Sequence, residues 1–230
     1  MIPKVIHYCW FGRGPKPKGV EKCISSWKKY CPDYFIKEWN EDNFDVHCNR
    51  YCEEAYKARK WAFVSDVARL HALVYEGGIY MDTDVEVVRN FDDLLSDKAF
   101  LGFEGTRWIA TSTMGTEPDN PILKSFLDSY TTRSFIRDDE TLDKTTNVGA
   151  LTALLLETQG LQLNGKHQTL ECFEVYPTDY FTPYDYISGR LRKTADTHTI
   201  HWFDQSWIER KPLRTKLLQF YHRMMGIHME

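Results

Sequence analysis

Asp82-Thr83-Asp84 is the stretch whose residue types and spacing most directly suggest chemistry. Two carboxylates two residues apart point to the same face of an extended segment, about 7 Å from each other. A carboxylate pair at the end of a buried strand is costly unless a cation lies between the two groups, so the motif predicts a cation site. Mg²⁺ or Mn²⁺ typically takes one or two carboxylates and completes its shell with phosphate oxygens and waters. The alternative is a turn with two solvated acids, because so short a motif is common by chance.

Asp66 and Arg69 lie shortly before this motif, three residues apart in a segment with helical periodicity. The apolar residues of that segment repeat along one helix face and are Phe63, Val67, Leu70 and Val74. Asp66 and Arg69 flank this stripe, which places them at the edge of the core. They form either an ordinary ion pair one helical turn apart, or one wall of a crevice that Asp82 closes. In the crevice, Asp66 would accept hydrogen bonds from sugar hydroxyls and Arg69 would contact phosphate or sugar oxygens.

Strand-like and helix-like stretches alternate along most of the chain, which is typical of an α/β fold with a mostly parallel sheet. The expected strands are 4–10, 34–39, 79–81, 99–104 and 108–114. The expected helices are 21–30, 63–76, 119–130 and 148–157, with Asn40 capping a further short acidic helix and Asn147 capping the last helix. Ligands bind such sheets at the carboxyl ends of the strands, where Trp10 and Asp82 are expected.

Composition excludes several classes of protein. The 230 residues carry 29 basic and 33 acidic side chains, a net charge of −4, whereas a general nucleic-acid binder has a basic footprint. There is no apolar run of the roughly 18 residues that a membrane span needs, and the N-terminus lacks a secretory signal. The six cysteines form no CxxC pair, and His47, Cys48 and Cys52 lack zinc-finger spacing. We therefore expect a cytoplasmic protein with reduced thiols.

Taken together, several blocks of the chain resemble family-32 glycosyltransferases, the Och1-like and capsular-polysaccharide enzymes that are related to the catalytic domains of glucosylating bacterial toxins. The blocks are IPKVIHYCWFG (2–12), SWKKYCPDY (26–34), EWNEDNFD (38–45), SDVAR (65–69) and EGGIYMDTD (76–84). The resemblance covers 2–103 well and the later half more loosely. It implies a GT-A fold, a nucleotide-diphosphate sugar donor, a Mn²⁺ or Mg²⁺ ion and retention of anomeric configuration.

The resemblance also implies roles for individual residues. Trp10 matches the aromatic residue that stacks on the nucleotide base. Asp66 and Arg69 match the pair that holds the donor sugar. Asp82 matches the first acid of the motif, near the sugar and ribose, and Asp84 matches the acid that binds the metal directly.

The segment HWFDQSW at 201–207 resembles the family's closing segment. There, the residues matching Ser206 and Trp207 reach the metal and the β-phosphate, and His201 becomes a third candidate metal ligand beside Asp82 and Asp84. The family's more familiar start is His-His-Trp, so the register of His201 departs from the pattern.

The proposed chemistry is sensible without the family. Breaking a sugar–phosphate bond leaves a diphosphate, and a metal with nearby donors stabilises the charge that grows on it. The oxocarbenium that forms needs an anion nearby, which Asp66 or the departing phosphate can supply. No covalent nucleophile is assigned, because the leaving phosphate can itself accept the proton of the acceptor. For Trp10 the alternative is a place in the core, and for His201 it is a place in the core or on the surface. Asn147 and Gly149, which open the last predicted helix, could donate hydrogen bonds to the acceptor or the sugar, although a plain N-cap is favoured.

The domain boundaries follow from these blocks: 1–208 is the GT-A domain, and 209–230 is a basic amphipathic helix. Such a helix can lie on the anionic cytoplasmic face of a membrane or pack its apolar stripe on the catalytic domain, and the sequence leaves both open. The resemblance adds that acceptors of bacterial members are often polyprenyl-linked sugars.

The sequence therefore predicts a metal-dependent retaining glycosyltransferase of polysaccharide or capsule synthesis. It would move a hexosyl group from a nucleotide sugar, a UDP-sugar being favoured over GDP-mannose, to a glycan or lipid-linked sugar. A nucleotide-sugar hydrolase or phosphotransferase could use the same carboxylates, but no P-loop or second carboxylate cluster accompanies them. A non-catalytic glycan-binding module is the third possibility, and the presence of all four of Asp66, Arg69, Asp82 and Asp84 argues against it.

Overall fold

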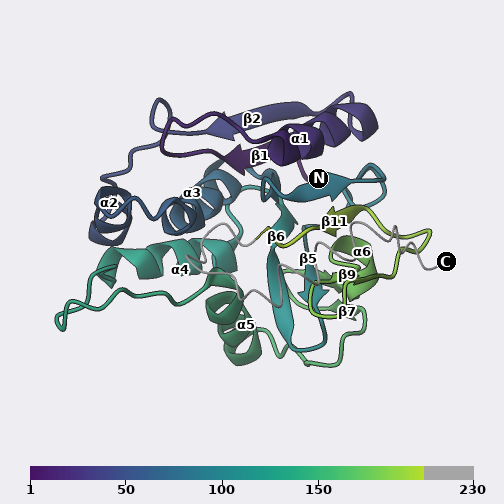
Figure 1. Cartoon of the computed structure of the whole chain (residues 1–230). Helices are drawn as coiled ribbons and strands as arrows, with labels where there is room; N and C mark the ends of the chain where they lie inside the picture. Colours follow the sequence, from purple (N-terminus) through teal and green to yellow (C-terminus); the bar gives the residue numbers. More distant parts are fainter. Residues whose placement is uncertain (205–230) are drawn as a thin grey trace.

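The computed structural model describes residues 1–204, so the predicted helix at 209–230, together with Ser206 and Trp207, lies outside the described residues. The centre of the described part is a seven-stranded sheet (Figure 1). Its strands, in spatial order, are β2 (Phe35–Trp39), β1 (Val5–Cys9), β3 (Gly78–Met81), β6 (Trp108–Thr116), β5 (Ala99–Glu104), β8 (Glu174–Tyr176) and β7 (Gln168–Thr169).

Most strands of this sheet run in one direction, as predicted. β1 pairs in parallel with β2 and β3, and β5 pairs in parallel with β8. β6 lies antiparallel between β3 and β5, so β5 has the direction of β3, and β7 is antiparallel to β8. The carboxyl ends of β1, β3 and β5 consequently meet at one edge, which is where ligands bind in sheets of this kind.

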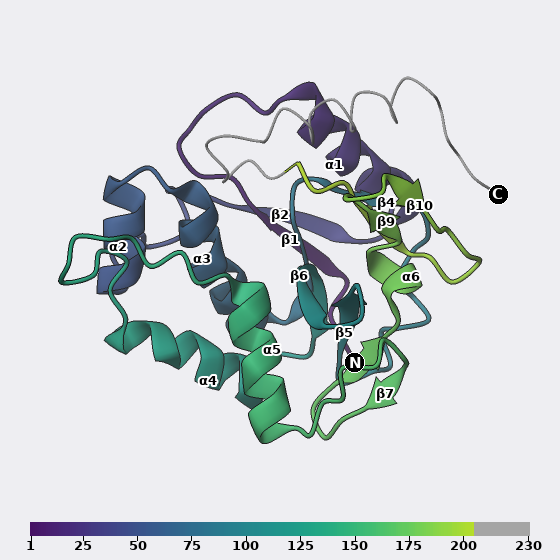
Figure 2. The same cartoon turned by 60° about the horizontal axis from the view of Figure 1, so that its bottom comes forward.

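Helices cover both faces of the sheet. They are α1 (Lys18–Tyr30), α2 (Arg50–Lys57), α3 (Trp61–Glu76), α4 (Pro121–Ser129), the 3₁₀ helix η1 (Tyr130–Thr132), α5 (Asn147–Thr158) and α6 (Thr178–Phe181). Figure 2 shows α2 to α5 gathered on one side of the sheet and α1 and α6 on the other. None of the helices in the described part has both the length and the hydropathy needed to cross a bilayer.

Two short sheets complete the second side. β4 (Val85–Val87) pairs antiparallel with β11 (Thr199–His201), and β9 (Tyr184–Asp185) pairs antiparallel with β10 (Arg190–Leu191). The β4–β11 pair matters for function, because it brings the end of the described chain back to the residues that follow β3.

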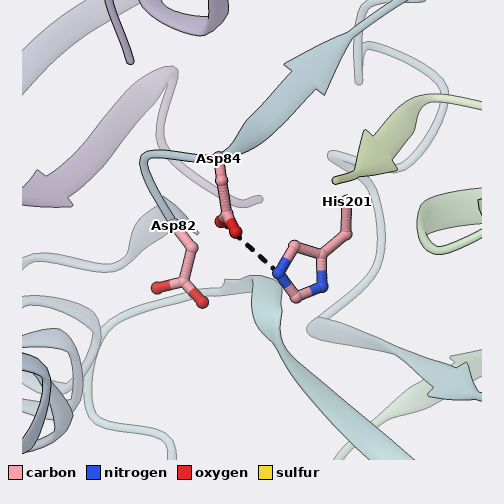
Figure 3. A group of neighbouring side chains, drawn as sticks. All are labelled: Asp82, Asp84 and His201. Carbon is pink, nitrogen blue, oxygen red and sulfur yellow. Dashed lines mark ion pairs between the residues drawn. The ribbon is translucent and has the colours of Figure 1, made fainter. Parts of the chain in front are cut away.

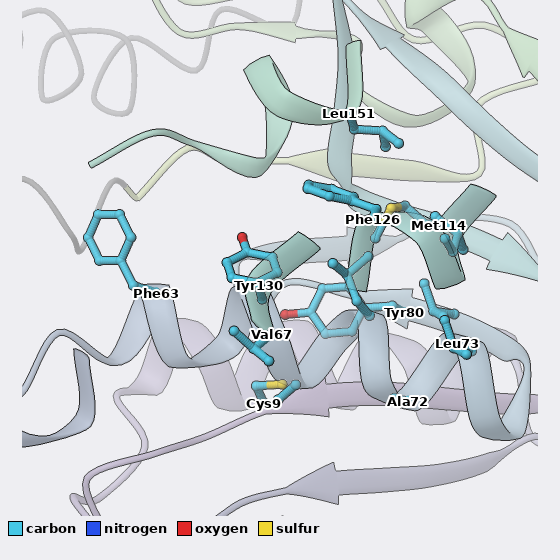
Figure 4. Packing of buried hydrophobic residues seen from close by; sticks show 14 of the residues in the cluster. Cys9, Phe63, Val67, Ala72, Leu73, Tyr80, Met114, Phe126, Tyr130 and Leu151 are labelled. Carbon is cyan, nitrogen blue, oxygen red and sulfur yellow. The ribbon is translucent and has the colours of Figure 1, made fainter. Parts of the chain in front are cut away.

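A separate hydrophobic cluster lies on each face of the sheet. Tyr80 packs into the cluster beneath α3, α4 and α5, which Figure 4 shows from close by. Ile79 and Met81 point to the other face and pack with Trp27 of α1 and Phe181 of α6. β3 is therefore buried on both faces, which explains why its sequence is apolar without alternation. The residues that follow it are held by a rigid neighbourhood.

One predicted helix is wrong. The residues after Asn40 form turns, in which the Asn40 side chain accepts from the N–H of Asp42 (2.9 Å) and the Asn43 side chain accepts from the N–H of Asn40 (2.9 Å). Such short side-chain to main-chain bonds compete with helix formation. The helix in this region is α2, whose N-cap Asn49 accepts from the N–H of Cys52 (2.9 Å).

Candidate active site

Asp82, Thr83 and Asp84 occupy a tight turn between β3 and β4. The N–H of Val85 donates to the carbonyl of Asp82 (3.1 Å), and the N–H of Asp82 donates to the carbonyl of Ser112 in β6 (2.9 Å). The prediction of an extended segment is therefore wrong, although both carboxylates face the same cluster, as predicted. The turn instead folds the two carboxylates toward one another and toward the end of β11.

His201 completes this cluster, which contains one ligand atom from each of Asp82, Asp84 and His201, all within 4.8 Å of one another. His201 is the last residue of β11 and pairs with Val85 of β4, so the strand pairing sets its position beside Asp84. Its Nε2 lies 3.4 Å from Oδ1 of Asp84 (Figure 3). The main chain after β11 also holds Asp84, because the N–H of Asp204 donates to its Oδ2 (2.8 Å).

The charges of Asp84 and His201 stabilise each other. Burial disfavours ionisation of Asp84, but the charge and hydrogen bond of His201 outweigh burial and lower the pKa of Asp84 to about 2. Burial likewise disfavours the charged imidazole, yet Asp84 outweighs it and raises the pKa of His201. The carboxylate is thus ionised at neutral pH, ready to bind a cation that takes the place of the imidazole proton.

The cluster suits a divalent cation. Two carboxylates and one imidazole supply three ligands and leave positions for phosphate oxygens or waters, which is the arrangement that Mg²⁺ and Mn²⁺ adopt with phosphate substrates.

Arg69, in the middle of α3, forms ion pairs with both Asp66 and Asp82, so the ordinary ion pair one helical turn apart is extended to the Asp82 turn. Nη2 of Arg69 lies 3.1 Å from Oδ1 of Asp66 and 3.2 Å from Oδ1 of Asp82. Nη1 donates to the carbonyl of Thr111 in β6 (2.8 Å), and the guanidinium lies over the ring of Tyr80, 4.6 Å from its centre. Arg69 is thus fixed on several sides, with 7% of its side chain exposed.

The pKa of Asp66 is unusual for a carboxylate beside an arginine. Burial raises it to about 7, the charge of Arg69 opposes the rise, and Asp82 adds to it. The guanidinium is shared between two carboxylates, so it compensates neither fully. Near neutral pH, Asp66 can therefore both donate and accept a hydrogen bond, which suits a group that contacts sugar hydroxyls.

Glu104 belongs to the same neighbourhood, although the sequence interpretation left it out. It is the last residue of β5, half-buried, and it interacts electrostatically with His201, Asp82 and Asp84. Burial and the two aspartates raise its pKa, while His201 opposes the rise. The sequence offered one signal for Glu104, which is that it lies at the carboxyl end of a predicted strand, where ligands bind in sheets of this kind.

Asn147 is a second residue whose role the sequence did not reveal. The prediction that it caps its helix is wrong, because Thr146 is the N-cap of α5 and accepts from the N–H of Gly149 (3.3 Å). The buried amide of Asn147 instead donates to the carbonyl of Asp66 (3.0 Å) and accepts from the hydroxyl of Tyr130. It therefore ties the start of α5 to the helix turn that carries Asp66.

Trp10 follows β1 directly, at the same edge of the sheet as Asp82. It is half-buried, its indole N–H donates to the carbonyl of Gly14 (2.7 Å), and the ammonium of Lys16 lies 5.8 Å from the ring centre. These contacts hold the ring in the loop after β1. Its stacking on a base stays a prediction, and Ser206 and Trp207 lie outside the described residues.

Known proteins resemble this chain in sequence. Residues 17–101 match the family model described as "Glycosyltransferase sugar-binding region containing DXD motif". Mannosyl phosphorylinositol ceramide synthase CSH1 of Saccharomyces cerevisiae is 27% identical over 56% of this chain and 35% of its own length. Inositol phosphoceramide mannosyltransferase 3 of Schizosaccharomyces pombe is 28% identical over 53% of this chain and 35% of its own length. The chain thus spans about a third of these two relatives.

Among solved structures, PaToxG glycosyltransferase has the same fold, with a TM-score of 0.54, 22% identity, and coverage of 68% of this chain and 69% of that one. The matched family region ends shortly after β5 begins and includes α3, β3 and the Asp82–Asp84 turn. The resemblance of this chain to the DXD-containing glycosyltransferases is therefore confirmed, and its fold is the GT-A fold that this resemblance implied.

Proposed function

We propose that the protein is a metal-dependent, retaining glycosyltransferase that moves a hexosyl group from a nucleotide-diphosphate sugar to a glycan or polyprenyl-linked sugar. The observation that carries the proposal is the convergence, at one sheet edge, of the cluster Asp82, Asp84 and His201 with the ion-paired Asp66 and Arg69. A lone acidic turn would not need a buried guanidinium shared between the turn and a helix.

Each residue has a distinct task in this proposal. A divalent cation held by Asp84, Asp82 and His201 would neutralise the diphosphate as the sugar–phosphate bond breaks. Arg69 is held in place before any ligand arrives, so it can contact sugar or phosphate oxygens without loss of side-chain freedom. Asp66 accepts hydrogen bonds from sugar hydroxyls and, when ionised, stabilises the positive charge that develops on the sugar.

A buried polar atom beside Asp82 supports the binding of a polar ligand. Ser112 lies opposite Asp82 across β3 and β6, and its Oγ has no hydrogen-bond partner within the described residues. Buried hydroxyl groups without a partner are rare, because losing hydration without compensation is costly. A sugar or phosphate oxygen next to Asp82 would supply the missing bond.

The donor is assigned by class. The sequence favours a UDP-sugar, and the names of the two fungal relatives, both mannosyl-transferring enzymes, make GDP-mannose the second candidate. In those names the mannose acceptor is an inositol phosphoceramide, which is a lipid. A cytoplasmic enzyme working on a lipid-linked sugar at the membrane face remains our expectation for the acceptor side.

Calorimetric titration tests the proposal. UDP and GDP are titrated into the wild-type protein, into Asp84→Ala and into the control Asp128→Ala, whose carboxylate forms an exposed ion pair on α4. We expect one nucleotide to bind only with Mn²⁺, and this binding to be lost in Asp84→Ala and retained in the control. Glycan binding without metal that survives Asp84→Ala would instead identify a binding module.

Turnover then identifies the donor and separates transferase from hydrolase. UDP-glucose, UDP-galactose, UDP-N-acetylhexosamines and GDP-mannose are screened for release of the nucleoside diphosphate, with and without added glycan. Release from GDP-mannose alone would contradict the preference for uridine. Release without acceptor at the rate of the best acceptor would contradict transfer and identify a nucleotide-sugar hydrolase.

A further inference from the structure

The hairpin formed by β5 and β6 extends beyond the Asp82 turn. β3 pairs with β6 only as far as Met81 and Thr113, whereas β5 and β6 continue to the pair Glu104 and Trp108. The end of the hairpin therefore lies beyond the level of the Asp82 turn along the sheet. Trp108, at the start of β6, keeps 50% of its surface exposed.

The face on which Trp108 lies follows from the strand register. Glu104 and Trp108 are direct cross-strand partners, so their side chains share one face of the hairpin and lie side by side. Gly102, two residues before Glu104, is on the same face, and there a side chain would collide with Phe181 of α6. This is the face of β11, and Glu104 interacts from it with His201 and Asp84.

The hairpin end is braced by bonds from both layers. The hydroxyl of Thr178 donates to the carbonyl of Gly105 in the turn (2.6 Å), and the hydroxyl of Thr182 donates to the carbonyl of Phe103 (2.8 Å). From the opposite side, the hydroxyl of Thr152 in α5 accepts from the N–H of Ile109 (2.9 Å). The exposed indole is thus presented on fixed backbone, which lowers the entropy cost of binding a ligand to it.

The residue types define the ligand. A flat indole offers a face on which the C–H groups of a pyranose ring can pack, and a carboxylate beside it accepts hydrogen bonds from the hydroxyls of that ring. The carboxylate of Glu104 disfavours an anionic ligand at the hairpin, because the proposed cation would compensate the charges of Asp82 and Asp84 but not that of Glu104. A neutral sugar can pack on the indole and bond to the carboxylate, and it carries no negative charge that Glu104 would repel.

We propose that Trp108 and Glu104 form the subsite for the acceptor sugar, with the sugar ring stacked on the indole and a hydroxyl bonded to the carboxylate. The inference rests on the proposed transferase function and adds where the acceptor binds. The ligand that this subsite recognises is a neutral pyranose at the end of the glycan or lipid-linked chain.

Direct binding is tested by NMR of the indole N–H groups in the presence of Mg²⁺, which is diamagnetic and does not broaden nearby signals, with UDP and, separately, with GDP. The Trp108 signal is the one that disappears in Trp108→Phe. Methyl α-mannopyranoside, methyl α-glucopyranoside and methyl β-galactopyranoside serve as probes. We expect at least one to shift the Trp108 signal with a dissociation constant on the order of millimolar, and to bind more weakly to Glu104→Gln. No shift with any probe overturns the subsite.

Kinetics provide the second test, with Phe35→Ala as the matched control, because Phe35 is an exposed aromatic residue on the edge strand β2. Trp108→Ala should raise the KM for the acceptor about tenfold and leave the KM for the donor unchanged. An acceptor KM that changes no more than in Phe35→Ala overturns the proposal. If the wild-type protein binds nucleotide with metal but no sugar shifts the indole signal, only this subsite is refuted. If the wild-type protein shows no metal-dependent nucleotide binding, the proposed function is refuted.

Discussion

At the residue scale, Asp66 shows how the site departs from what stability alone would select. A buried carboxylate normally has a full counter-charge, but the guanidinium of Arg69 is shared with Asp82. The consequence is a carboxylate that ionises only near neutral pH, with a pKa of about 7. Such an arrangement is typical of a functional site, where charge is positioned for a ligand that has not yet arrived.

Asp66→Asn should therefore stabilise the protein at alkaline pH. Because folding raises the pKa from 3.8 to about 7, the native state loses stability as the pH rises from about 4, and the loss is complete above about 7. A shift of this size corresponds to about 4 kcal/mol, an upper limit for the gain. We expect the variant's free energy of unfolding, relative to wild type, to increase over this pH range in urea titrations.

A difference between the two proteins that stays constant with pH would show that Asp66 ionises as easily in the fold as in the unfolded chain. Activity serves as the control for function, because the same substitution should abolish transfer while it stabilises the fold. Glycosyl transfer at the wild-type rate in Asp66→Asn would remove this residue from the catalytic set.

At the element scale, the short strand β3 positions the site. Its first residue, Gly78, determines how closely β3 packs against β1. Gly78 has φ +94°, and a Cβ there would lie 2.7 Å from the carbonyl oxygen of Val5 in β1. A side chain at this position meets both backbone strain and a clash with a neighbouring main chain. Neither can be relieved by a rotamer change.

Gly78→Ala should consequently cost about 3 kcal/mol or more of stability. Gly160→Ala is the matched control, since Gly160 has φ +67° and open space around its missing Cβ. Strain alone should cost that variant about 1 kcal/mol. Chemical denaturation measures both, and equal losses would mean that the contact between β1 and β3 is not tight.

The elements that the sequence predicted well are those with a local signal. α3 has an apolar stripe and ends at Glu76, where Gly77 caps it, and β5 spans the predicted 99–104. The predictions failed where the local structure is determined by hydrogen bonds to other parts of the chain or between side chain and main chain. The helix expected after Asn40 is replaced by turns, and Asn147 has its partners on α3 and η1 rather than on its own helix.

At the scale of the whole molecule, the candidate site joins parts of the chain that are distant in sequence. Asp82 and Asp84 follow β3, whereas His201 arrives with β11 from the end of the described chain. No local pattern tells which histidine meets which acid, and here the family resemblance supplied what spacing could not. The resemblance did not supply Glu104, whose place in the site depends on the antiparallel insertion of β6.

A metal that binds this cluster should therefore stabilise the whole fold, because its ligands come from two segments that only the folded state brings together. At a Mn²⁺ concentration one hundred times its dissociation constant, a ligand specific to the native state adds about 2.7 kcal/mol. For a domain of this size, that gain raises Tm by roughly 5 to 10 °C.

Thermal unfolding followed by circular dichroism, with and without Mn²⁺, measures the shift in wild type, Asp84→Ala and the control Asp128→Ala. We expect the increase in wild type and in the control, and none in Asp84→Ala. Hydrogen exchange should show the added protection at the amides of β4 and β11, since the pairing of these strands holds His201 beside Asp84. An equal increase of Tm in Asp84→Ala would place the bound ion elsewhere on the molecule, and the pairing of β4 with β11 would then serve structure alone.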